Sequence, residues 1–130
     1  IGSGYVTPIS GDFGVDGVVL SKNGNVLIQC KHTKKLTNDA IQQIISGKIV
    51  YEKELNVKFD KLIVITTTND MSNEVYEFPE KYNKEIEIYT RKDLAEMLTK
   101  NKTKYSEIIE KSKRYSIEEL RKEVKYKITN

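Results

Sequence analysis

Residues 11–32, GDFGVDGVVLSKNGNVLIQCKH, decide how this chain folds. Two β-rich runs, at residues 18–20 and 26–28, flank the pair Asn23-Gly24, which suits a tight hairpin turn. Three glycines among residues 10–17 indicate a turn just before the first run. The stretch therefore predicts a glycine-rich turn followed by a β-hairpin, and we expect the rest of the chain to pack around it.

The open end of this hairpin is expected to gather three polar side chains. Because a strand alternates its side chains, Gln29 and Lys31 project to one face while Ile28 and Cys30 project to the other. Asp16 opens the first arm, so the hairpin brings it back beside Gln29 and Lys31. A carboxylate, an amide and an ammonium at one sheet end predict a site for a hard divalent cation and a phosphate. Cys30 is expected to be a small buried hydrophobe.

Length and composition narrow the class of protein. The 130 residues suit one domain with its own core, and 38% hydrophobic with 32% charged residues is typical of a globular protein. No apolar run approaches the roughly 20 residues that span a bilayer, and no signal-peptide pattern occurs. One cysteine and one histidine exclude an internal disulfide and a conventional zinc site, which favours a cytoplasmic setting. Because the chain begins with Ile, we expect a fragment or a trimmed product.

Charge is unevenly distributed along the chain. Residues 91–130 carry 12 Lys and Arg against 7 Asp and Glu, whereas residues 1–90 carry 10 against 12. This basic C-terminal third either lies along a phosphate backbone or forms an ordinary solvated helical surface. Charge alone leaves both alternatives open.

Strand and helix patterns alternate along the rest of the sequence. The run at 61–68, KLIVITTT, is β-branched throughout, which indicates a strand buried on both faces. Capping patterns at 90–93 and 116–119 predict the starts of two late helices. The expected order is a strand at 5–9, the hairpin, a helix at 37–55, a strand at 61–68, a helix at 73–82, a strand at 85–89 and then helices. This order predicts an α/β sandwich with a mixed sheet.

The pattern Gly14-x-Asp16, twelve residues, then Gln29-x-Lys31 resembles the PD-(D/E)xK nuclease superfamily. More narrowly, it resembles the Mrr-like restriction endonuclease catalytic domain, in which Gln commonly replaces the acidic residue. The helix after Lys31, the threonines that follow the buried strand, and the closing strand and helix occur in the family's order. The resemblance covers roughly residues 4–98.

This resemblance implies a restriction-endonuclease-like three-layer sandwich, with a central mixed sheet flanked by helices. The endonuclease core is expected over residues 1–99, followed by a basic helical C-terminal extension over residues 100–130. The family also has a helix before its first strand, which we expect either to precede Ile1 or to be replaced by another region. The helices after residue 100 then pack into that place, dimerise or bind DNA, and the sequence leaves these alternatives open.

By resemblance, the function is that of a Mg²⁺-dependent (or Mn²⁺-dependent) DNA endonuclease acting in restriction or defence against foreign or modified DNA. Asp16 would be the main carboxylate ligand of the metal, joined by the Gln29 side chain and the Cys30 backbone carbonyl. Lys31 would position or help deprotonate the attacking water and steady the phosphate. Two other functions stay open: a catalytically silent module that binds nucleic acid or a partner, and a structure-specific, junction-type nuclease.

Further side chains are candidates for contact with the substrate, each with a plain structural alternative. Asp12 is either a carboxylate near the metal or a turn residue, and His32 either packs or contacts a phosphate. Recognition of the target is expected to lie elsewhere in the full polypeptide, a homodimer is one open arrangement, and no membrane is involved. The complete set of candidate contacts is Asp12, His32, Lys34, Lys35, Gln43, Thr67 and Thr68.

Overall fold

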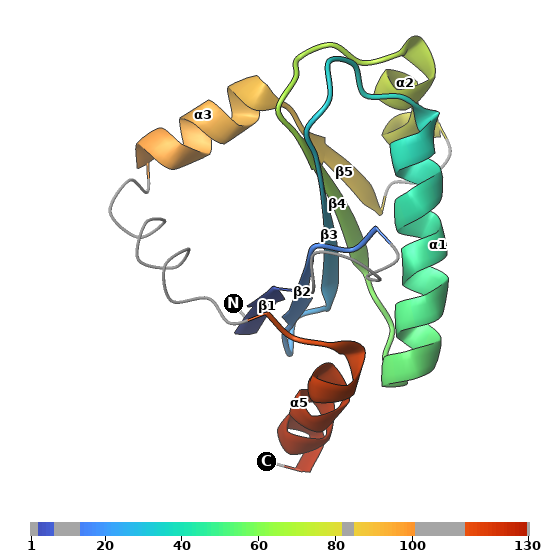
Figure 1. Ribbon diagram of the computed structural model, residues 1–130, viewed down its shortest axis with the longest axis vertical. Coiled ribbons are helices and arrows are strands. Elements are labelled where there is room, and N and C mark those ends of the chain that lie inside the picture. Colours follow the sequence, from blue (N-terminus) through green and yellow to red (C-terminus); the bar gives the residue numbers. More distant parts are fainter. Residues whose placement is uncertain (1–2, 7–13, 82–84, 101–113, 130) are drawn as a thin grey trace.

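A computed structural model describes residues 3–6, 14–81, 85–100 and 114–129. The elements alternate in the order that the sequence predicts (Figure 1). They are β1 (Ser3–Val6), β2 (Gly17–Leu20), β3 (Val26–Lys31), α1 (Asn38–Leu55), β4 (Lys61–Thr66), α2 (Asn73–Lys81), β5 (Ile86–Tyr89), α3 (Arg91–Lys100) and α5 (Ile117–Thr129).

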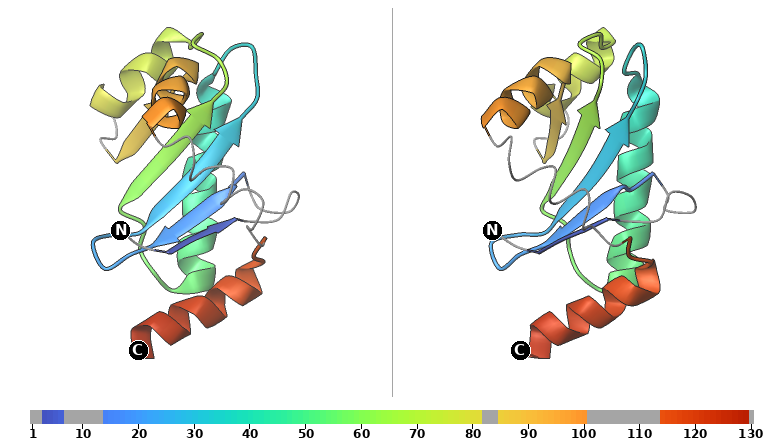
Figure 2. Two further views of the ribbon diagram at one scale, coloured as in Figure 1. Left: turned by 90° about the vertical axis from the view of Figure 1, so that its left-hand side faces the viewer. Right: turned by 60° about the vertical axis from the view of Figure 1, so that its left-hand side comes forward.

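One mixed sheet forms the centre of the fold, with strands in the order β1-β2-β3-β4-β5. The pairs β1–β2 and β2–β3 are antiparallel, whereas β3–β4 and β4–β5 are parallel. Helix α1 covers one face of the sheet and α3 lies on the other, near the carboxyl ends of β4 and β5 (Figures 1 and 2). The predicted three-layer α/β sandwich of the restriction-endonuclease type is therefore confirmed.

The core lies between the sheet and α1. Leu27 of β3 and Leu62 of β4 are fully buried against Ile41 and Ile44 of α1, which recur at helical spacing. The opposite face of β4 is only half-buried, at residues 63 and 65, so the prediction of a strand buried on both faces is wrong. The strand is central in the sheet, but in the described chain only α3 packs over this face, at one end of the strand.

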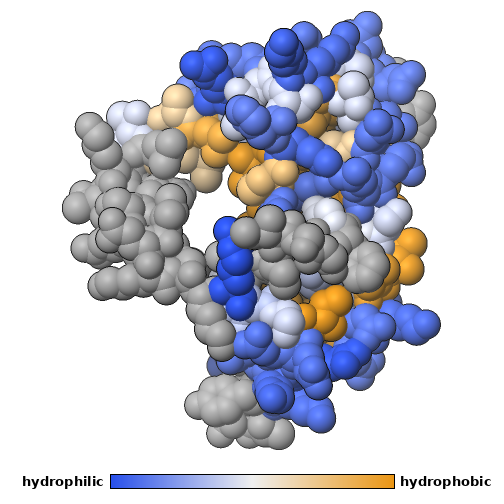
Figure 3. All heavy atoms as spheres, viewed as in Figure 1, coloured by the Kyte–Doolittle hydropathy of each residue, from blue (hydrophilic) through white to orange (hydrophobic). Residues whose placement is uncertain are grey.

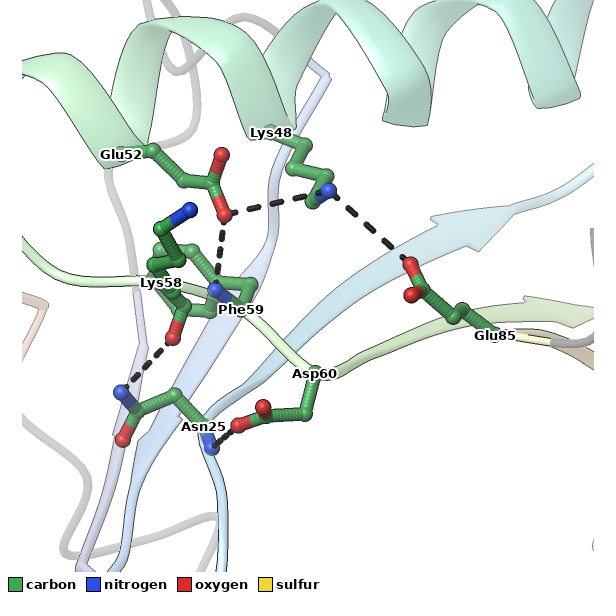
Figure 4. Close-up of polar contacts among 7 residues, drawn as sticks. All are labelled: Asn25, Lys48, Glu52, Lys58, Phe59, Asp60 and Glu85. Atoms are coloured by element: carbon green, nitrogen blue, oxygen red, sulfur yellow. Dashed lines mark hydrogen bonds and ion pairs between the residues drawn. The ribbon is translucent and has the colours of Figure 1, made fainter.

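The hairpin loop is longer than the predicted tight turn and is tied to another part of the chain. It spans residues 21–25, with the Gly24 amide donating to the Ser21 carbonyl at 3.2 Å. The Asn25 amide donates to Asp60 at 2.8 Å, and the Asn25 side chain donates to the Lys58 carbonyl at 2.9 Å (Figure 4). Because Asn25 bonds outward to residues 58–60, it cannot close a two-residue turn.

A second set of contacts fixes the same end of the sheet to α1. The Phe59 amide donates to the Glu52 carboxylate at 2.8 Å, and Lys48 lies 3.9 Å from both Glu52 and Glu85 (Figure 4). These contacts join the loop before β4, the start of β5 and the last two turns of α1. The end of the sheet remote from the carboxyl ends of the parallel strands is therefore held by side chains.

The helices α3 and α5 begin with the predicted capping patterns. Thr90 donates to Asp93 from its amide at 2.8 Å and from its hydroxyl at 3.0 Å, and the Glu119 amide donates to the Ser116 hydroxyl at 3.2 Å. Thr37 stands at the N-cap of α1 but makes no side-chain cap bond. Asn56 ends α1 in the left-handed conformation, at φ 55°.

Helix α5 packs against the lower end of α1 and contributes to the same core. Leu120 is completely buried and Val124 nearly so, while Arg121 bonds to the Glu54 carboxylate and carbonyl. The Tyr5 ring meets Tyr115 edge-on at a centroid distance of 4.8 Å. Packing is therefore the observed arrangement for this part of the C-terminal extension. Residues 101–113 of the expected helical extension lie outside the described residues, as do residues 7–9 of the expected strand at 5–9.

Among the helices of the described residues, none combines the length and the apolar character needed to cross a lipid bilayer.

Candidate active site

Asp16 lies at the open end of the β2–β3 hairpin, as predicted. Its amide donates to the Ile28 carbonyl at 2.8 Å, which extends the strand pairing by one residue beyond Gly17. Its carboxylate accepts a 2.6 Å hydrogen bond from the Cys30 amide. Such a charge-assisted bond fixes the carboxylate beside the backbone that carries Gln29, Cys30 and Lys31.

Gln29 is buried beneath α1 and is held by a second amide. Only 1% of its surface is exposed, and its Nε2 donates to the Gln43 Oε1 at 2.7 Å. The Gln29 Oε1 is buried with no hydrogen-bond partner among the described residues. A buried polar atom without a partner costs about 1–3 kcal/mol, so a water or an ion that bonds to the Gln29 Oε1 would be stabilised there.

Lys31 ends β3 on the same face as Gln29. It pairs in register with Thr66 of β4, whose side chain is fully buried. The Lys31 side chain itself is half-exposed, so it reaches from the α1 face toward solvent at the carboxyl edge of the sheet. This edge is where ligands usually bind in α/β sheets with parallel strands.

Cys30 is exposed, so the expectation of a small buried hydrophobe is wrong. Its side chain projects from the face opposite α1, where the described part of the chain covers β3 incompletely. Desolvation by the atoms around it, together with the nearby Asp16 carboxylate, raises the pKa of the thiol. The protonated form of the thiol is therefore favoured more than in a free cysteine.

The backbone amide and carbonyl of Cys30 face the Asp16 side of β3. The Thr67 amide donates to the Lys31 carbonyl at 3.1 Å, so the peptide groups of Lys31 point toward β4. In a strand, successive residues turn these groups to opposite sides. The Cys30 carbonyl therefore points away from β4, to the side on which its own amide meets Asp16.

This donor set fits a hard divalent cation. The set offers oxygen donors: one carboxylate, one side-chain amide oxygen without a partner and one backbone carbonyl. Mg²⁺ and Mn²⁺ prefer oxygen ligands, and Mg²⁺ retains several of its waters when it binds a protein. Within the described ranges, no group of three or more His, Cys, Asp or Glu side chains could hold a metal. A site of few protein ligands is therefore the kind that these residues offer.

Gly14 makes the close packing of this site possible. It adopts φ +78°, and a Cβ built there would lie 3.3 Å from both the Gln29 Nε2 and the Gln43 Cβ. Both features favour glycine: the left-handed backbone and the lack of space. The sequence pattern included Gly14, but its contact with Gln43 required the fold to bring α1 over the turn.

We expect Gly14→Ala to lower the free energy of unfolding by about 1–2 kcal/mol, because alanine is strained at this φ and would push the paired amides apart. Urea denaturation measures the loss. Gly4→Ala is the matched control, since a Cβ at Gly4 would meet nothing within 4 Å. Equal stability of the two variants would contradict the packing described for Gly14.

Four predicted substrate contacts lie together on the other face of the sheet. They line a pocket of about 640 Å³ bordered by α3, here named the α3 pocket: His32, Lys34, Thr67 and Thr68. The His32 Nδ1 shares a 3.1 Å hydrogen bond with the Thr67 hydroxyl. Gln43 instead lies with Asp16 and Gln29, Lys35 is exposed beside the pocket, and Asp12 falls outside the described residues.

The sequence reasoning missed Arg91, which begins α3 and lines the α3 pocket. Arg91 stands just after the end of the parallel strand β5, so the rule that ligands bind at the carboxyl ends of strands could have found it. Thr66 is buried at the end of β4 and does not line the pocket, unlike Thr67 and Thr68.

Residues 2–98 match the family Mrr_cat, described as restriction endonuclease. The chain belongs to this Mrr_cat family. The Mrr_cat match spans all the predicted catalytic residues and ends near the close of α3, before α5. The chain is accordingly a domain of the restriction endonuclease family.

Two further comparisons complete this picture of the Mrr_cat chain. A crystal structure of a repair endonuclease from Pyrococcus abyssi is similar with a TM-score of 0.47 and 18% sequence identity. The similarity covers 66% of this chain and 35% of that chain, so this chain spans about a third of that protein's length. No curated protein sequence matches the chain.

Proposed function

We propose that this domain is a Mg²⁺-dependent endonuclease that hydrolyses phosphodiester bonds of DNA at the carboxyl edge of β3. The observation that supports the proposal most is the sheet end at which the Asp16 carboxylate, bonded to the Cys30 amide, lies beside the buried Gln29. Hydrolysis needs an activated water and compensation for charge on the phosphoryl oxygens, and these residue types suit both tasks.

In this proposal the metal is held by the Asp16 carboxylate, the Gln29 Oε1 and the Cys30 carbonyl. When bound, Mg²⁺ or Mn²⁺ supplies positive charge that lowers the pKa of a bound water and offsets charge on the phosphate. The Cys30 amide keeps the Asp16 carboxylate in place, and Gln43 keeps the Gln29 side chain in place. Both ligands are therefore preorganised before substrate arrives.

Lys31 acts on the substrate in this proposal. Its ammonium, on the same face as Gln29, lies against the phosphoryl oxygens and stabilises the negative charge that builds on them. It also orients the attacking water by a hydrogen bond. With Gln29 in place of a carboxylate the site carries one negative charge fewer, which weakens metal binding but eases the approach of an anionic substrate.

The biological role we propose is restriction, that is, defence against foreign or modified DNA in the cytoplasm. The family description supports restriction, and the surplus of basic residues after residue 90 supports contact with DNA. We further propose that target recognition resides in another domain or subunit and that a homodimer would present one site to each strand.

The test is cleavage of duplex DNA by the wild-type chain in Mg²⁺ and in EDTA, together with a metal titration of Gln29→Glu. Wild type should cleave only with the metal. The added carboxylate should lower the half-saturating Mg²⁺ concentration by about tenfold, because ligand charge tunes affinity for hard cations. Gln43 can accommodate the variant by rotating its amide to donate.

Melting temperature with increasing Mg²⁺ gives a second readout that does not depend on activity. Mg²⁺ should raise the melting temperature of Gln29→Glu more than that of wild type, because a tighter ligand stabilises the folded state more. Cleavage that persists in EDTA would overturn the metal role. Salt-dependent DNA binding without cleavage in Mg²⁺ or Mn²⁺ would favour the silent binding module, and cleavage of branched DNA alone would favour the junction-type nuclease.

A further inference from the structure

The α3 pocket lies across the carboxyl edge of the sheet from the proposed active site. Its wall on one side comes from residues that follow β3 and β4, and on the other from the first turns of α3. Leu94, half-buried, and Ala95 make an apolar wall, and Figure 3 shows apolar surface under α3 on the side that faces the sheet. The volume of about 640 Å³ exceeds what a single phosphate needs and falls within the range of about 300–1,000 Å³ typical of small-molecule pockets.

Backbone and side-chain bonds hold this pocket in shape. The Thr68 hydroxyl donates to the Lys34 carbonyl at 2.9 Å, and the Arg91 amide donates to the Thr68 carbonyl at 3.2 Å. The Asn69 Oδ1 accepts from the Lys92 amide at 3.0 Å, which leaves the Asn69 NH₂ as a donor. The three segments that form the pocket are therefore joined before any ligand binds.

Charge and chemistry of the lining favour a nucleotide. Lys34 and Arg91 are cationic, and none of the described residues that line the pocket is acidic. The nearby Asp93 carboxylate is occupied by the two bonds from Thr90. The His32 ring, fixed by Thr67, and the Arg91 guanidinium are planar groups on which a base can stack.

We propose that the α3 pocket holds one unpaired nucleotide of the DNA strand that crosses the active-site edge. The cations bind its phosphate, the planar groups and Leu94 receive its base, and Asn69 donates to the base edge. A paired base is stacked and hydrogen-bonded within the duplex, so its faces and its pairing edge are not available to these groups, whereas those of an extrahelical nucleotide are.

The position of the pocket relative to Lys31 links it to the proposed function, on which this inference rests. His32 directly follows Lys31, so the two Cα atoms are about 3.8 Å apart, and strand alternation turns their side chains to opposite faces. A DNA strand that crosses this edge can therefore meet Lys31 on one side and the pocket on the other. The domain would thereby prefer DNA with an unpaired nucleotide next to the cut.

Binding measured in EDTA tests this proposal without cleavage. Three labelled duplexes of one sequence are compared at fixed ionic strength: fully paired, with one unpaired nucleotide, and with the same insertion abasic. The wild-type chain should bind the duplex with the unpaired nucleotide about tenfold more tightly than the paired duplex. The abasic insertion should lose this gain, because it has no base to stack on the planar groups of the pocket.

Variants of the pocket should remove this preference selectively. Ala95→Phe fills the pocket at an exposed helix position without changing charge, and Arg91→Gln removes a cation. Lys92→Gln removes the same charge from the next residue, which does not line the pocket, and should keep the preference. Equal wild-type affinity for all three duplexes, or a preference that survives Ala95→Phe, would overturn the proposal. If the wild-type chain binds the unpaired nucleotide more tightly but does not cleave DNA in the presence of a metal, the proposed function alone would be refuted.

Discussion

Lys31→Ala is expected to slow cleavage of duplex DNA about a thousand-fold, equivalent to about 4 kcal/mol of transition-state stabilisation. Lys31 ends β3 on the face that carries Gln29, so its ammonium is the cation expected at the scissile phosphate. The half-exposed side chain adds little to the core, so the variant should melt close to wild type. Single-turnover cleavage with saturating enzyme separates the chemical step from DNA binding.

Lys22→Ala provides the matched control for this experiment. Lys22 is exposed in the hairpin loop, at the opposite end of β3 from Lys31, and its removal changes the net charge equally. Cleavage by this variant should remain within about twofold of wild type once binding is saturated. Comparable rates for Lys31→Ala and Lys22→Ala would rule out the assignment of catalysis to this sheet end.

Leu120→Ala should have the largest effect on stability, lowering the free energy of unfolding by about 3 kcal/mol. Leu120 is completely buried in the core, although it belongs to a helix that lies beyond the family match. Truncation of a buried leucine loses transfer free energy and leaves a cavity, which together cost about 2–5 kcal/mol. Urea denaturation followed by circular dichroism measures the change.

The number of unfolding transitions in urea also tests the proposed domain boundary near residue 100. If α5 and the sheet share one core, wild type and variant should each unfold in a single transition. Lys122→Ala, at an exposed position of the same helix, should change the stability by less than about 0.5 kcal/mol. A loss below 1 kcal/mol for Leu120→Ala, or two separate transitions, would indicate that α5 is an independent unit.

Local patterns predicted most of the fold and the position of Asp16 beside the end of β3. The strand period placed Gln29 and Lys31 on one face, and the hairpin geometry brought Asp16 to within 2.6 Å of the Cys30 amide. The alternation of the strand and the pairing of the hairpin both follow from local backbone geometry, which a short segment of sequence is enough to predict. The capping pattern of Thr90 with Asp93 is predictable for the same reason, since partner and cap lie three residues apart.

Features that depend on distant contacts were not predictable in this way. The exposure of Cys30 depends on what packs over the α3 face of β3, and a strand pattern cannot tell which face another element covers. The hairpin loop length depends on Asn25 finding Asp60, 35 residues away. Arg91 joins His32 only because β5 lies parallel to β4, so that the start of α3 reaches the same edge.

The contacts of Asn25 and Asp60 have a consequence for the chemistry at the opposite end of β3. They fix which residue of β3 stands opposite Lys61, and the same alignment sets Gln29 opposite Val64 and Lys31 opposite Thr66. A slip by one residue would exchange the two faces of the strand and carry Lys31 away from the side of Gln43. Two residues about 13 Å along the strand from Gln29 thus help to set which face of β3 carries the proposed catalytic residues. Damage there would resemble a defect in the proposed site, although none of the atoms of that site had changed.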